Sequence, residues 1–221
     1  MGHATRLAPL FLPLLACSVS RGVRPLGDGV TAVTATAGGP MADYLGSMKP
    51  LPIGTVGVRH GLTDAVDVHG AVNWGTLAFF GLFGAEVGAG WMFLEPDGAR
   101  PALMGDLTLD LFAGDLSSGP PDGGLRAFTE LDLRASWAYG AKEHLIYTGP
   151  TVLTQPAPFV NRGAWSVGNQ LTFKKADLIT ELKWLAPMQD SKAASIDFGG
   201  IGGQGALSIQ LGGRIKFGGP Q

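Results

Sequence analysis

The sequence predicts an all-β protein, an antiparallel transmembrane β-barrel of about ten strands. Apolar and polar residues alternate with a period of two over most of the chain, which is typical of strands whose faces meet two different environments. Only 15% of the 221 residues are charged, whereas soluble domains carry about 25%. Sixteen basic against eighteen acidic residues leave no cationic excess, so nucleic acid is not expected as a partner.

The first 16 residues have the pattern of a secretory signal peptide. Arg6 ends a short cationic region, and the apolar stretch from Leu7 to Ala16 contains Pro9 and Pro13. A membrane-spanning helix needs about 20 apolar residues and does not tolerate interior prolines well. The stretch therefore indicates a signal peptide, residues 1–16.

Leu14-Leu15-Ala16-Cys17 closes this segment and resembles the lipobox of bacterial lipoproteins. The resemblance implies that Cys17, the only cysteine, becomes the lipidated mature N-terminus and that residues 17–29 form a linker behind it. Because Ser18 follows, it also implies handling by the lipoprotein-sorting machinery and anchoring in the cell outer membrane. The alternative is an incidental cysteine beside an ordinary cleavage site.

Runs of alternating residues bounded by turn signals predict a barrel over residues 30–217 and a short tail over 218–221. Most runs are long enough for a tilted transmembrane strand of about 9–11 residues. A short helical turn is considered only at Met41–Met48. The predicted strands lie at residues 30–37, 53–61, 64–74, 78–94, 101–113, 125–138, 143–154, 162–174, 176–186 and 203–217.

The predicted connections alternate in length, as in outer-membrane barrels with periplasmic turns and longer external loops. An even number of strands places both ends of the barrel on the periplasmic side. Gly75–Leu77 is the exception to this alternation: it is short, although its place in the order is that of a longer external loop. The short turns are at residues 62–63, 95–100, 139–142 and 175, and the longer segments are at 38–52, 114–124, 155–161 and 187–202.

Two segments resemble parts of small bacterial outer-membrane β-barrels. Arg59 to Val68 is similar to their strand–turn–strand hairpin, and Leu207 to Phe217 is similar to their closing strand. The resemblance covers residues 30–217 and implies an outer-membrane lipid environment and recognition by the barrel-assembly machinery. It is architectural and implies no substrate.

One face of the predicted strands carries aromatic residues near the strand ends, which is typical of interfacial girdles. These residues are Trp74, Phe79, Trp91, Phe93, Trp137, Tyr147, Trp165, Phe173, Trp184 and Phe217.

The opposite face carries charges of both signs. A barrel of about ten strands encloses a space that side chains largely fill, so we expect these charges to pair across a narrow lumen. The predicted lumen-facing residues are Arg59, Asp67, His69, Glu86, Asp106, Asp110, Arg126, Glu130, Asp132, Arg134, Glu181, Lys183, Arg214 and Lys216.

The sequence favours a non-catalytic role: structural, as a narrow pore, or in binding through the loops. Because Asp67 and His69 share one face, an outer-membrane enzyme that hydrolyses lipid or peptide is one alternative. A soluble periplasmic β-barrel lipoprotein with an apolar ligand inside is another. No cofactor is expected, and no metal ion, because three or four convergent ligands are not visible.

The lipobox resemblance predicts acylation of Cys17. A radioactive fatty acid should label the wild-type protein, whereas Cys17→Ser should give an unlabelled precursor that is mislocalised or uncleaved. Equal labelling of the two proteins would contradict the prediction.

Overall fold

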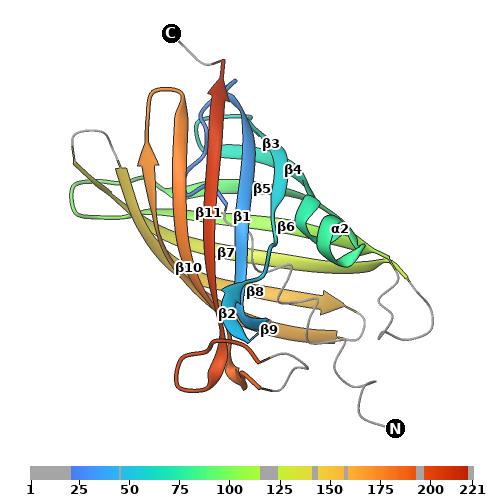
Figure 1. Ribbon diagram of the computed structural model, residues 1–221. Coiled ribbons are helices and arrows are strands. Elements are labelled where there is room, and N and C mark those ends of the chain that lie inside the picture. Colours follow the sequence, from blue (N-terminus) through green and yellow to red (C-terminus); the bar gives the residue numbers. More distant parts are fainter. Residues whose placement is uncertain are drawn as a thin grey trace, which may run out of the picture.

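The computed structural model describes residues 21–44, 46–114, 124–140, 144–156, 159–192 and 197–218, and shows a closed antiparallel β-barrel (Figure 1). Ten strands form the wall in chain order, β1 beside β3 and onward to β11, and β11 pairs with β1 to close it. The short β2 pairs with the distal part of β1 and lies outside the closed ring. The predicted fold class is therefore confirmed.

The elements of the barrel have the following bounds: β1 Thr31–Tyr44, β2 Ser47–Pro50, β3 Thr55–Gly61, β4 Val66–Asn73, α2 Trp74–Phe80, β5 Phe83–Leu94, β6 Ala102–Ala113, β7 Arg126–Tyr139, β8 His144–Pro156, β9 Phe159–Thr172, β10 Ala176–Asp190 and β11 Gln204–Phe217.

Several predicted segments differ from the structure, among them the expected connection 38–52, in which β1 continues to Tyr44 and β2 covers Ser47–Pro50. The helix α2 occupies the start of the strand expected at 78–94, because the Asn73 side chain caps it by accepting from the amide of Thr76 (3.0 Å) and Gly81 ends it with a φ of 66°. Met41–Met48, the possible helical turn, belongs instead to the hairpin of β1 and β2. Within the described ranges, no helix has the length and hydropathy needed to cross a membrane.

The connections define two ends of the barrel. The short-turn end carries residues 62–65, 95–101, 140–143 and 173–175, and the long-loop end carries the other connections. The segment 155–161, expected to be a longer loop, is mostly strand, since β8 runs to Pro156 and pairs there with Phe159. The barrel begins and ends at the short-turn end, where Thr31 lies opposite Phe217.

The two faces of the wall have opposite chemistry. On the outer face, Val87, Leu211 and Ile215 are each 56% exposed. On the inner face, Asp67 and Glu130 are fully buried. A continuous apolar outer surface around a polar interior is the arrangement of a lipid-facing barrel, and a charged interior does not suit the apolar ligand of the soluble alternative.

Most of the predicted girdle aromatics lie on the outer face, but three predictions were wrong. Tyr147 is fully buried in the lumen, because the register of β8 points it inward with Leu145, and its hydroxyl donates to Glu181 Oε2 (2.9 Å). Trp74 and Phe79 are exposed, but both belong to the helix α2 rather than to the end of a strand, so these two positions also differ from the prediction.

The apolar outer face predicts a depth-dependent response to charge. In lipid vesicles, Leu109→Arg at the middle of β6 should lower the free energy of unfolding by about 2–4 kcal/mol, because an outward arginine would lie in hydrocarbon. The matched change Leu125→Arg, beside the long-loop end of β7, should cost at most about 1 kcal/mol. Equal losses in urea titrations of the two variants would contradict a lipid-facing wall.

Candidate functional site: the charged lumen

The strand register creates an acidic wall on the inner face of β5, β6 and β7. Glu86 lies opposite Asp110, and Asp106 lies opposite Asp132. Like charges directly opposite each other destabilise a sheet, and burial increases the cost of any carboxylate left without a cation. This wall therefore depends on cations that other parts of the chain supply.

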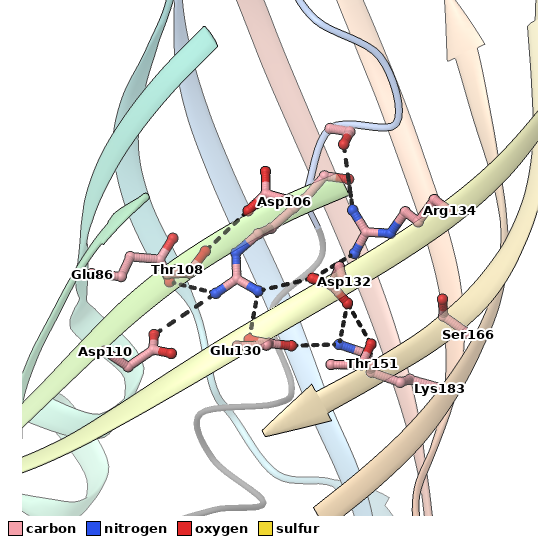
Figure 2. A network of polar contacts seen from close by, with 12 residues as sticks. Glu86, Asp106, Thr108, Asp110, Glu130, Asp132, Arg134, Thr151, Ser166 and Lys183 are labelled. Carbon is pink, nitrogen blue, oxygen red and sulfur yellow. Dashed lines mark hydrogen bonds and ion pairs between the residues drawn. The ribbon is translucent and has the colours of Figure 1, made fainter. Parts of the chain in front are cut away.

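Three basic side chains of the barrel meet the acidic wall: Arg59 contacts Asp106, and Figure 2 shows the other two, Lys183 and Arg134. Lys183 on β10 is fully buried, and its Nζ lies 3.0 Å from Glu130 Oε1 and 3.8 Å from Asp132 Oδ1. Arg134 on β7 lies 3.2 Å from Asp132 Oδ2 and 3.8 Å from Glu181 Oε2. Thr151 also donates a hydrogen bond to Asp132. Asp132 thus accepts contacts from side chains of several strands.

A second cluster lies closer to the short-turn end. Arg59 donates from Nε and Nη2 to the two oxygens of Asp67, both at 2.6 Å, and Nη2 also reaches Asp106 Oδ2 at 3.0 Å. A Cβ atom at Gly90 would lie 2.4 Å from Arg59 Nη2, so the glycine leaves room for this pair. The bidentate geometry fixes both side chains.

A third cluster joins β10 and β11 at the same end. Asp177 accepts hydrogen bonds from Arg214 and from Lys216, the latter at 3.1 Å. Arg214 and Asp177 are buried, whereas the Lys216 side chain keeps 21% of its surface exposed.

Residues 21–29, assigned to the linker on sequence, turn back from the start of β1 into the lumen. At the short-turn end the amide of Gly29 donates to the Gly61 carbonyl (3.1 Å), and the packing is so close that a Cβ on Gly61 would lie 1.8 Å from the Gly27 oxygen. Further inside, the Leu26 amide donates to Asp67 Oδ2 (3.2 Å). Val23 is fully buried in a cluster with Leu145, Tyr147 and Ile179.

Arg21 is the innermost described residue of this segment and is the cation that the acidic wall lacks. Its guanidinium contacts four carboxylates, which Figure 2 shows converging on one point. The nitrogen–oxygen distances are 2.5 Å to Glu130, 3.3 Å to Asp132, 3.4 Å to Glu86 and 3.7 Å to Asp110.

The barrel also binds the backbone of the segment. Arg134 Nη1 donates to the carbonyl oxygens of Arg21 and Gly22, both at 3.3 Å, and Arg214 Nη1 donates to that of Arg24 at 3.5 Å. The Arg24 Nε in turn donates to Ser136 Oγ (3.4 Å). Side chains of the wall therefore hold the segment at several points along its length.

Apolar side chains fill the lumen between this charged layer and the long-loop end. Phe112 and Phe128 pack edge to face with their ring centroids 5.9 Å apart. The buried cluster comprises Ala42, Leu51, Ile53, Phe112, Phe128, Leu153, Ala164, Leu185, Ala186, Phe198 and Ala206.

Of the fourteen lumen-facing residues predicted from the sequence, thirteen take part in contacts of the lumen. Arg126 is the exception: it is half-buried at the first residue of β7 and joins none of the ion pairs recorded between described residues. The prediction did not select Arg21 or Asp177. Asp177 lies on the predicted polar face, whereas the nearly balanced charges of the predicted lumen gave no signal for Arg21.

The pair considered for catalysis is brought into the lumen but not onto one reactive centre. Both oxygens of Asp67 are engaged by Arg59, while His69 Nε2 lies 3.2 Å from Thr108 Oγ1. The Thr108 hydroxyl donates to Asp106 Oδ1 at 3.0 Å. No group of histidine, cysteine or acidic side chains suited to a metal ion occurs in the described part of the chain. Cys17 lies outside it.

No family model and no curated protein sequence matches this chain. Among solved structures, it is similar to the translocator domain of the autotransporter NalP from Neisseria meningitidis, with 9% identity, coverage of 95% of this chain and 94% of that chain, and a TM-score of 0.43. The NanC porin has 12% identity, 85% and 100% coverage and a TM-score of 0.40. The outer-membrane protease OmpT from Escherichia coli has 12% identity, 89% and 99% coverage and a TM-score of 0.39. These likenesses are too distant to assign a role.

The Arg59–Asp67 pair yields a prediction for stability. Asp67→Asn should lower the free energy of unfolding by about 3–5 kcal/mol, because the buried guanidinium of Arg59 loses its bidentate carboxylate partner. The control Asp97→Asn, in an exposed turn, should change it by no more than about 0.5 kcal/mol. Urea titration that finds the two variants alike would contradict the assigned role of the pair.

Proposed function

We propose that the protein is an outer-membrane β-barrel with a closed lumen, non-catalytic, which acts as a structural protein of the envelope or binds partners through its long-loop end. The observation that carries this proposal is the position of residues 21–29 inside the lumen, with Arg21 in contact with four buried carboxylates. A segment held in this way occupies the path that a pore would need.

The outer-membrane location is supported by the distribution of side chains over the wall. The outer face is mostly apolar, with a few polar side chains such as His60 and Asn161, and the charged side chains of the strands are gathered inside. Such a surface requires lipid around it, so outer-membrane lipid and the barrel-assembly machinery are the partners that the proposal implies.

Three layers support a closed lumen. The N-terminal segment fills the short-turn half, the ion pairs around Arg21 and Asp132 cross the middle, and the cluster of Phe112 and Phe128 fills the long-loop half. Barrels with wide aqueous channels have about 16 strands, whereas barrels of small strand number are filled by side chains.

A non-catalytic role is supported by the state of the candidate residues. Asp67 is held on both oxygens by Arg59, and it also accepts the Leu26 amide. A carboxylate in these contacts has no free oxygen to serve as a general base, since a base must reach the proton that it removes.

Exposed apolar side chains support binding at the long-loop end. Met188, near the end of β10, is 93% exposed, and Ile201, in the connection to β11, is 51% exposed. Contiguous exposed apolar surface is typical of interaction sites, and in this proposal Met188 and Ile201 belong to such a surface.

The proposal includes lipidation of Cys17, on the lipobox resemblance alone. Cys17 lies four residues before Arg21, and four residues of extended chain span at most about 14 Å.

Recording in planar bilayers tests the closed lumen. The purified wild-type protein should give no porin-scale conductance, because charged and apolar side chains fill its lumen. Heat-modifiable migration of the same sample on a gel confirms that the barrel is folded. Large, stable and weakly selective single-channel steps from the folded protein would contradict the proposal.

A further inference from the structure

Four carboxylates surround the guanidinium group of Arg21. Glu86, Asp110, Glu130 and Asp132 come from three adjacent strands of the wall, and all four lie within 3.7 Å of a guanidinium nitrogen. The side chains are between 0% and 9% exposed. A planar group with five donors matches several carboxylates at once better than an ammonium ion does.

The charge of the wall requires such a ligand. Glu130 and Asp132 also contact Lys183 or Arg134, whereas Glu86 and Asp110 have Arg21 as their only cation in the ion pairs between described residues. Without a cation at this point, the two facing carboxylates of Glu86 and Asp110 would be buried with no countercharge, which is costly.

Arg21 belongs to a segment whose main chain is hydrogen-bonded to the main chain of the wall at the rim. From Arg21 to Leu26 the segment is held by side chains of the barrel: two arginines donate to its carbonyl oxygens, and Asp67 accepts one of its amides. Contacts to the main chain of a segment, together with one site for a charged side chain, are elements of peptide recognition.

We infer that the four carboxylates around Arg21 form a binding site for an alkylguanidinium ligand, and that residues 21–29 occupy it as an internal peptide. The site takes the side chain of an arginine carried on a peptide segment, here residues 21–29. The inference concerns recognition and goes beyond the proposed closure of the lumen, so its test does not use conductance.

Chemical rescue of full-length Arg21→Ala tests the site. Loss of the guanidinium should lower the temperature at which the folded gel band disappears by about 10 °C, because four buried carboxylates lose their common cation. Refolding the variant with millimolar N-ethylguanidinium should restore at least half of this loss, because the small cation fits the space that the side chain leaves.

Two controls separate a guanidinium site from a general effect of cations. Tetramethylammonium at the same concentration should not rescue Arg21→Ala, since it has no N–H donors. Arg24→Ala, on the same segment but outside the carboxylate set, should gain nothing from N-ethylguanidinium. Equal rescue by both cations, equal rescue of both variants, or a wild-type melting temperature for Arg21→Ala would overturn the inference.

A second variant keeps the test decisive if Arg21→Ala does not fold. Arg21→Ala combined with Glu86→Gln and Asp110→Asn removes two of the charges that the ligand neutralises. This variant should fold without any added cation and should melt at the same temperature with and without N-ethylguanidinium. A melting temperature that rises with the ligand as much as in Arg21→Ala, or failure of both variants to fold with the ligand present, would contradict the site.

Discussion

A buried carboxylate is costly unless a cation or hydrogen-bond donors compensate it, and this constraint organises the barrel. The antiparallel register sets Glu86 against Asp110 and Asp106 against Asp132, so the wall cannot neutralise itself strand by strand. Cations must cross the lumen instead. Lys183 does so from β10, Arg59 from β3 and Arg21 from the chain that precedes the barrel. The ion pairs consequently join opposite sides of the wall and join the wall to the segment inside it.

This dependence makes the N-terminal segment part of the folded barrel. Its backbone is held by Arg134 and Arg214, and the rim is shaped to receive it at Gly61. The interior is then occupied from the short-turn end to the apolar cluster of Phe112 and Phe128. Surfaces available for recognition are left at the loops and on the outer wall, where apolar side chains are exposed. For this reason we propose binding at the long-loop end and a structural role for the lumen.

Much of this architecture could be predicted from the sequence, because alternation reports directly which residues face which side of a strand. The sequence predicted nearly all of the charged residues that face the lumen, including Lys183 and Arg214. The prediction of a strand was wrong at α2, because Asn73 caps the start of a helix there and Gly81 ends it, although the residues alternate as in a strand. Arg21 was missed because its segment has no periodicity, and only the cross-strand register shows that the wall needs it. Tyr147 was placed outside because its hydroxyl partner, Glu181, comes from a distant strand.

The central claim is that the N-terminal segment lies inside the barrel, and cysteine accessibility measures this directly. In a Cys17→Ser background, a cysteine at Val23 can be compared with one at Asp97, in an exposed turn. With the folded protein in detergent, a polyethylene-glycol maleimide should modify the cysteine at position 97 quickly and leave the one at position 23 unmodified until the sample is boiled. Equal rates of modification at the two positions in the folded protein would show that the segment lies outside the lumen.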